Sequence, residues 1–186
     1  MGDLEAENAR LAAEVARLER RVAELERLAD RDPLLPLLNR RAFVRELGRA
    51  LAFQARYGGE AALVFFDVDG LKRINDAHGH AAGDAALAAV AQTLVEQVRE
   101  TDVIGRLGGD EFAVIFTQAP RADAEAKAAA LAASVAAQPL VHDGLLIPLS
   151  VAWGARVVEP GRTPAELLAE ADAAMYLRKA REAPRR

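Results

Sequence analysis

Two adjacent carboxylates stand at a tight bend in the segment RLGGDEFAVIF, which runs from Arg106 to Phe116. The Gly108–Gly109 pair between two apolar runs is typical of a tight β-hairpin. Hairpin tips commonly carry one polar residue for solubility, but the neighbouring acids Asp110 and Glu111 repel each other unless positive charge lies nearby. These residues therefore predict a cation at the bend.

A third acid, Asp67, lies at the end of the apolar run AALVFFDVD over residues 61–69. We expect this run to form a buried strand beside the hairpin, so that Asp67 faces Asp110 and Glu111 across a narrow gap. Oxygen ligands without soft donors favour Mg²⁺ or Mn²⁺, and two such ions suit phosphoryl or nucleotidyl transfer. The alternative is that an acid pairs the hairpin tip with a neighbouring Lys or Arg.

The polar segment DVDGLKRINDAHGHAAGD, residues 67–84, follows directly and is interpreted as a loop. Gly70 allows the backbone to turn and to present N–H groups to an anion, and Lys72 adds a positive charge beside them. Asn75 and Asp84 carry an amide and a carboxylate that together can read the edge of guanine. The alternatives are that Asn75 is a turn residue and that Asp84 caps a helix.

Apolar periodicity and breaker residues predict the elements that position these side chains. Helices are expected over about 39–57, 81–99, 122–138 and 164–181, and strands over 61–69, in a hairpin over 102–117, in a small hairpin around 143–144, and in a long strand after it. The last helix opens at Thr163–Pro164, a cap followed by proline at the first helical position. The order contains β-α-β-β-α-β, which predicts a sandwich-like α+β domain with a ferredoxin-like antiparallel sheet and surrounding helices.

The first thirty residues carry a heptad pattern that differs from the rest of the chain. The d positions are Leu4, Leu11, Leu18 and Leu25, and the a positions are Asn8, Val15, Val22 and Ala29. Valine at a and leucine at d favour a parallel two-stranded coiled coil, in which an asparagine at a fixes the register. The alternative is a single amphipathic helix packed on its own domain. Because Asp32–Pro33 and Pro36 break the helix, we expect a dimerisation helix over 1–31 and a globular domain over 32–186.

Composition restricts the compartment and the partners. The chain has 186 residues, 52% of them hydrophobic, and a net charge of −4, which fits one globular domain with an appendage and gives no reason to expect nucleic acid. There is no cysteine, no apolar run of about 18 residues and no signal peptide. We therefore expect a cytoplasmic protein without a membrane partner. The spacing of His78 and His80 does not suit a metal, and we interpret both as loop packing.

The segments RLGGDEF and FDVDGLKRINDAHGHAAGD together closely resemble the GGDEF domain of diguanylate cyclases, over residues 32 to about 181. Members of that family join two GTP molecules into cyclic di-GMP, a bacterial second messenger, and release two pyrophosphates. The resemblance implies a sheet of the nucleotidyl cyclase type, two Mg²⁺ (or Mn²⁺) ions in each active site, and a homodimer. It also implies that cyclic di-GMP is both product and inhibitor.

The resemblance implies roles for individual acids. The Asp67 carboxylate and the Val68 carbonyl would bind metal. Asp110 would bind metal and take the proton of the 3′-hydroxyl, and Glu111 would be a further ligand or support. Lys72 is placed with Asp110 and Glu111 in the catalytic set.

The substrate-binding residues are carried over in the same way. The N–H groups of Gly70 and Leu71, together with Lys72, would hold the β- and γ-phosphates. The guanine would lie against Asn75 and Asp84. Lys179, in the segment MYLRKAR, resembles the family's C-terminal lysine that contacts phosphate.

A further match concerns regulation. The segment RETD, from Arg99 to Asp102, resembles the R-x-x-D inhibitory site at which cyclic di-GMP binds as product. An arginine can fork onto phosphate and guanine while the aspartate accepts from guanine. The alternative is a surface ion pair at the end of a helix.

The chain departs from the family pattern in three places. Leu35 and Pro36 replace a threonine and a glycine after the linker, and Glu182 and Ala183 replace a glycine and an arginine near the C-terminus, where Arg181 could supply the lost contact. We also expect the sensor domain to lie outside this chain, which resembles an output fragment or an engineered chain.

Three other functions compete with the cyclase. The first is a catalytically silent GGDEF domain that binds GTP or cyclic di-GMP. The second is another nucleotide cyclase on the same scaffold, which Asp84 disfavours because a carboxylate suits guanine. The third is a structural dimerisation module, which leaves the acids unexplained.

Overall fold

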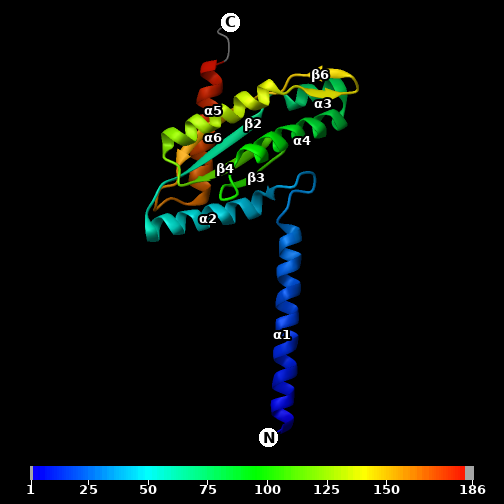
Figure 1. Ribbon diagram of the computed structural model, residues 1–186, viewed down its shortest axis with the longest axis vertical. Helices are drawn as coiled ribbons and strands as arrows, with labels where there is room; N and C mark the ends of the chain where they lie inside the picture. Colours follow the sequence, from blue (N-terminus) through cyan, green and yellow to red (C-terminus); the bar gives the residue numbers. More distant parts are fainter. Residues whose placement is uncertain (1, 183–186) are drawn as a thin grey trace. The chain divides into compact units, whose positions relative to one another are not determined.

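The computed structural model describes residues 2–182, with the side chains of 2–6, 9, 19, 22–28 and 182 left aside. Two compact units make up the chain, Met1–Arg31 and Asp32–Arg186. The first contains the helix α1, Gly2–Ala29 (Figure 1). Within it Leu11, Val15 and Leu18 are 51%, 53% and 48% exposed, so the described part of the heptad stripe presents apolar surface. The heptad side chains of Leu4, Val22 and Leu25 lie outside the described ones, and the coiled coil stays a prediction.

The second unit is built on a five-stranded sheet in the order β1-β3-β4-β2-β7. Its strands are β1 (Leu38–Asn39), β2 (Ala61–Val68), β3 (Val103–Arg106), β4 (Glu111–Thr117) and β7 (Val151–Val157). All pairs are antiparallel except β1 with β3, which is parallel. The two-residue strand β1 was not predicted. A separate hairpin joins β5 (Leu140–His142) to β6 (Leu145–Ile147), as expected. The predicted α+β fold with a central antiparallel sheet is confirmed.

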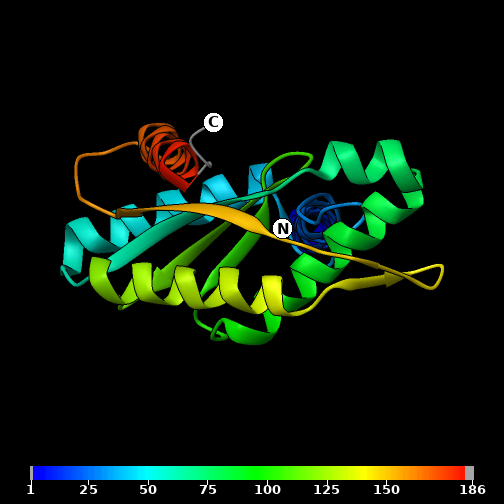
Figure 2. The same ribbon diagram turned by 90° about the horizontal axis from the view of Figure 1, so that it is seen from above.

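Helices cover both faces of this sheet (Figure 2). They are α2 (Arg40–Tyr57), α3 (Leu71–His78), α4 (His80–Gln97), α5 (Arg121–Ala137) and α6 (Pro164–Glu182). Strand residues alternate between two cores: Val64 and Phe66 pack with α4 and α5, whereas Leu63 and Phe65 pack with α2 and α6. This alternation is the period of two expected for a sheet buried on both faces.

The interpretation of residues 67–84 as a loop is wrong over most of its length, because α3 and the start of α4 fill it. Gly70 turns the chain out of β2 with φ of 69°, and Gly79 separates the two helices with φ of 83°. Both are left-handed conformations that glycine adopts without strain. Leu71 packs at the edge of the core and Ile74 is buried, so an apolar pair at helical spacing orders the segment.

The start of the second unit is held by Asp32. Its Oδ1 accepts hydrogen bonds from the backbone N–H groups of Leu34 and Leu35, at 3.0 and 2.9 Å, and from Arg106 Nη1 at 3.1 Å. Leu35, one of the departures from the family pattern, is buried against the α4–α5 core. The leucine therefore adds apolar packing to this turn. Pro36 is exposed.

Candidate active site

Asp67 and Glu111 are direct neighbours across β2 and β4, which confirms that the buried strand lies beside the hairpin. Their Cα atoms are register partners in the antiparallel ladder. The backbone N–H of Val68 donates to the carbonyl of Asp110 at 3.0 Å, so the ladder is continued into the bend. The sheet therefore holds three acidic residues of two distant segments at one end.

Glu111 lies in an electronegative environment. Burial raises the pKa of its carboxyl above the ordinary value, the charge of Arg40 opposes this shift, and the carboxylates of Asp110, Asp172 and Asp67 add to it. A cavity of about 280 Å³ is lined by Glu111, Arg40 and Asp172 among others. Asp172 was not predicted as a site residue. It lies seven residues before Lys179 on α6, a spacing that puts both on one side of a helix.

Asp67 is neutralised by a lysine from the end of α6. Lys179 Nζ lies 2.7 Å from Asp67 Oδ1 and 2.9 Å from Asp69 Oδ1. Burial alone lowers the pKa of Lys179, but the hydrogen bonds and charges of Asp67 and Asp69 raise it overall. Asp69 also accepts from Ser150 Oγ at 2.9 Å. For Asp67 the structure thus shows the alternative arrangement, an acid paired with a neighbouring lysine.

The expected gathering of three carboxylates around one point is not formed. Within residues 2–182, no three acidic or histidine side chains are grouped closely enough to hold a metal ion. The physical reason is the ammonium of Lys179, which draws the Asp67 carboxylate toward α6. Asp67 and Asp110 nevertheless lie near enough to Glu111 to raise its pKa.

The segment predicted to hold phosphates forms the start of α3. Gly70 precedes the helix, Leu71 is its first residue, and Lys72 is exposed beside them. The carbonyl of Gly70 accepts from the N–H of Ile74 at 3.1 Å, so the first N–H groups of the helix are not used by that bond. This end of α3 follows directly from β2, the strand that carries Asp67.

The two residues predicted to read guanine come from adjacent helices. Asn75 lies within α3, and its side chain packs so closely on α4 that a β-carbon at Gly83 would collide with it. Asp84 is exposed in the second turn of α4, whose cap is Gly79 without a side-chain hydrogen bond. The turn and helix-cap alternatives are therefore wrong for these two residues. His78 and His80 are exposed, so their interpretation as loop packing is also wrong.

Arg99 and Asp102 are separated in their environments. The Asp102 side chain is 1% exposed, and its Oδ2 accepts from Lys127 Nζ at 3.0 Å and from the backbone N–H of Arg99 at 2.9 Å. Its Oδ1 accepts from the N–H of Thr117 at 3.1 Å. The Arg99 residue is exposed. The ion pair of Asp102 is thus with Lys127 rather than with Arg99.

Comparison with known proteins decides the family. The family model "Diguanylate cyclase, GGDEF domain" matches residues 29–185. The chain belongs to the GGDEF domain family. Diguanylate cyclase TpbB of Pseudomonas aeruginosa strain UCBPP-PA14 is 42% identical over 153 residues, which are 81% of this chain and 35% of TpbB. The chain thus spans about a third of that relative. An uncharacterized 19.3 kDa protein of Streptomyces ambofaciens is 39% identical, with 82% of this chain and 80% of that protein covered.

Solved structures agree with this assignment. The coiled coil and GGDEF domain of DgcB from Caulobacter crescentus, in complex with c-di-GMP, matches with a TM-score of 0.82 and 30% identity, over 96% of this chain and 95% of that chain. The GGDEF domain of TpbB from Pseudomonas aeruginosa matches with a TM-score of 0.75 and 41% identity, over 81% and 89% of the two chains.

The C-terminal departure of this GGDEF domain has a structural outcome. Arg181 lines a cavity along β7 together with Arg178, a different cavity from the one that Glu111 and Asp172 line. The side chain of Glu182 and all of Ala183 lie outside the described residues. Over the described part of the GGDEF chain, no helix is long and apolar enough to cross a membrane.

Proposed function

We propose that this chain is a diguanylate cyclase that condenses two GTP molecules into cyclic di-GMP and releases two pyrophosphates. The observation that carries the proposal is the register of Asp67 against Glu111, which places acids from β2 and β4 beside the start of α3. The relatives named diguanylate cyclase support it. Since GTP is the substrate, we place the activity in the cytoplasm.

The start of α3 and its contact with α4 would bind the nucleotide. The N–H groups of Gly70 and Leu71 with the charge of Lys72 would hold the β- and γ-phosphates, because free N–H groups at a helix start attract anions. Asn75 and Asp84 project from neighbouring helices and would accept and donate along the guanine edge. Lys179 would move from Asp67 to a phosphate oxygen.

The donor set at the strand ends suits a hard divalent cation. The Asp67, Asp110 and Glu111 carboxylates and the Val68 carbonyl are all oxygen ligands, the type that Mg²⁺ and Mn²⁺ prefer. The raised pKa of Glu111 records an excess of negative charge that such a cation would relieve. We propose that these residues hold two Mg²⁺ or Mn²⁺ ions. When bound, the ions stabilise the charge that develops on the α-phosphate and on the leaving pyrophosphate.

The remaining step is removal of a proton from the attacking 3′-hydroxyl. Asp110 is proposed as the base because it stands on the bend, with its main chain fixed to Val68. Glu111, which begins β4 and is partly buried, is proposed to support the metal site and thereby Asp110. Lys72 is proposed to complete the catalytic set through its charge on the triphosphate.

A homodimer is required by the chemistry. One domain binds one GTP, so ring closure needs two domains whose nucleotides face each other. We propose that α1 forms a parallel coiled coil through its stripe of half-exposed apolar residues, Leu11, Val15 and Leu18, and so raises the effective concentration of the second domain over 32–186. The DgcB structure, which contains a coiled coil and a GGDEF domain, supports this division.

We also propose product inhibition by cyclic di-GMP at Arg99 and Asp102. The exposed Arg99 would supply the charged contact to phosphate and guanine. The buried Asp102 would fix the turn that carries Arg99, through the N–H of that residue, and would exchange part of its bonding for guanine.

One observation favours a second function. Lys179 engages both Asp67 and Asp69, an arrangement that suits a silent GGDEF domain that binds nucleotide without cyclising it. Incubation with GTP and Mg²⁺, followed by chromatography, separates the two functions. Cyclic di-GMP that accumulates in proportion to enzyme supports the cyclase, whereas retained GTP binding without product supports the silent module.

A further inference from the structure

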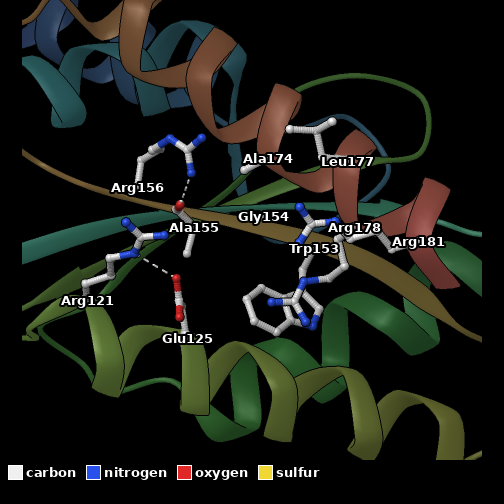
Figure 3. A pocket seen from close by; sticks show the side chains of 10 residues that line it. All are labelled: Arg121, Glu125, Trp153, Gly154, Ala155, Arg156, Ala174, Leu177, Arg178 and Arg181. Atoms are coloured by element: carbon white, nitrogen blue, oxygen red, sulfur yellow. Dashed lines mark hydrogen bonds and ion pairs between the residues drawn. The ribbon is translucent and has the colours of Figure 1, made fainter.

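A cavity of about 360 Å³ lies along β7, between α5 and α6 (Figure 3). Four arginines line it from three elements: Arg121 of α5, Arg156 of β7, and Arg178 and Arg181 of α6. Glu125 is the one acid in the lining. None of the residues proposed above for metal, substrate or product lines it, so this arginine cavity is separate from the candidate active site.

The cavity exists because β7 is an edge strand of the sheet and two helices pack on its opposite faces (Figure 2). The Trp153 side chain belongs to the core under α4 and α5, whereas Arg178 comes from α6 on the other face. The guanidinium carbon of Arg178 nevertheless lies 3.6 Å from the centroid of the indole ring. Arg178 therefore reaches around the edge of the sheet, and it brings positive charge from α6 toward Arg121 of α5.

The charge of the lining is only partly neutralised. Arg121 Nε pairs with Glu125 Oε1 at 2.8 Å. Arg156 donates from Nη1 to the carbonyl of Ala155 at 2.9 Å, and its Nε is 3.9 Å from Glu170, which also pairs with Arg162. Four arginines against one lining glutamate leave a formal charge of +3. Such an excess in a concave site selects an anion with several negative charges.

Three features point to phosphate as the anionic group. Every cation of the lining is an arginine, whose planar fork matches phosphate oxygens in pairs, and none is a lysine. The volume falls in the range of about 300–1,000 Å³ in which proteins bind small molecules. The guanidinium groups converge from two helices and one strand, so a compact ligand can contact several of them at once.

We propose that the arginine cavity binds a small ligand with at least two phosphate groups, either inorganic pyrophosphate or a nucleoside diphosphate. Both sources share the diphosphate that Arg121, Arg156, Arg178 and Arg181 would bind. This site does not depend on the proposed cyclase activity.

The chain contains one tryptophan, and it lines this cavity, so its fluorescence reports occupancy. The full chain is titrated with inorganic pyrophosphate and, separately, with guanosine diphosphate, in EDTA so that no metal site contributes. We expect a saturable change of Trp153 emission with both ligands, and the same affinities by calorimetry. Equal affinities indicate that the diphosphate suffices, and tighter binding of the nucleotide indicates added contacts of the nucleoside.

The variants Arg156→Gln and Arg178→Gln should each weaken binding at least about tenfold, because each removes a charged hydrogen-bonding group. Calorimetry is used for Arg178→Gln, since loss of the cation over the indole changes its emission. The matched control is Arg49→Gln, which removes an equal charge from an exposed pair with Glu46 on α2. Far-UV circular dichroism verifies that all three variants are folded.

Several results would overturn the proposal. They are no saturable binding by fluorescence or calorimetry, affinities of both cavity variants within about twofold of the parent, and binding of a glutamate-rich peptide in place of pyrophosphate, which would indicate a partner strand on β7. Asp67→Asn separates this site from the proposed function, because it removes a proposed metal ligand yet should bind pyrophosphate in EDTA as the parent does.

Discussion

Lys179 Nζ donates to Asp67 Oδ1 at 2.7 Å, although 112 residues separate the two in the chain. The same ammonium lies 2.9 Å from Asp69 Oδ1. One protein cation thus holds the carboxylate that the family resemblance assigns to metal, and it ties the last turns of α6 to the end of β2. A metal ion and Lys179 cannot both neutralise Asp67 fully, so the two should compete for it.

This competition predicts the behaviour of Lys179→Gln. Without the ammonium, Asp67 and Asp69 lose their cation, so Mn²⁺ should bind the nucleotide-free chain about fivefold more tightly, a typical coupling between linked sites. The KM for GTP should rise, because the proposed phosphate contact is lost. Electron paramagnetic resonance of free Mn²⁺ measures the first effect. Arg181→Gln removes a charge from the same helix end without a contact to Asp67, and an equal gain in that variant would contradict direct competition.

The acids at the strand ends should be essential for cyclisation. Asp67→Asn and Asp110→Asn should each reduce cyclic di-GMP formation at least about 100-fold, because each removes a proposed metal ligand or base. EDTA should abolish the activity of the parent, and added Mg²⁺ should restore it. Product is measured by chromatography after incubation with GTP. Asp76→Asn, an exposed acid on α3, is the control, and parental rates in Asp67→Asn would exclude the metal site.

Much of this site could be predicted because its elements are local. The apolar run of β2, the glycines of the bend and the alternation of β4 fix two neighbouring strands, and their register brings Asp67 opposite Glu111. The helix α3 was missed because polar residues outnumber its two apolar contacts. The pairing of Lys179 with Asp67, and the meeting of Arg178 with Trp153, depend on how α6 packs against the sheet. No spacing along the sequence encodes that packing.

The heptad stripe of α1 predicts that activity depends on dimer formation. Val15→Lys combined with Leu18→Lys places charges on the proposed seam, so cyclisation at nanomolar enzyme should fall at least about tenfold while GTP binding persists. Sedimentation and product assays over a range of enzyme concentrations test this. Ala13→Lys combined with Ala16→Lys adds the same charge off the seam. If the seam variant cyclises GTP as fast as this control, α1 is not the dimerisation element.

Arg99 and Asp102 should respond differently to substitution. Arg99→Ala removes an exposed side chain, so inhibition by added cyclic di-GMP should weaken at least about tenfold with little change in stability. Asp102→Ala leaves Lys127 and two backbone N–H groups without their acceptor, and should lower the free energy of unfolding by about 2–4 kcal/mol. Urea unfolding and inhibition curves measure the two effects. Undiminished inhibition of Arg99→Ala would remove this residue from the inhibitory site.

The packing of α6 on β7 depends on Gly154. A β-carbon at this position would collide with the main-chain atoms of Ala171 and Met175, so no side chain can rotate away to accommodate it. Gly154→Ala should therefore lower the free energy of unfolding by about 1–3 kcal/mol, as overpacking of a core does. It should also shift α6, and with it the contact of Lys179 to Asp67.

Gly48→Ala is the matched control for this substitution. Gly48 lies within α2, and the nearest atom to an added β-carbon is Pro164 Cγ at 3.8 Å, an ordinary contact. Because alanine favours a helix over glycine, this variant should be more stable by about 0.5–1 kcal/mol. Urea denaturation of both variants gives opposite signs if close backbone approach governs Gly154. A stabilised Gly154→Ala variant would show instead that α6 can move away from β7 at no cost.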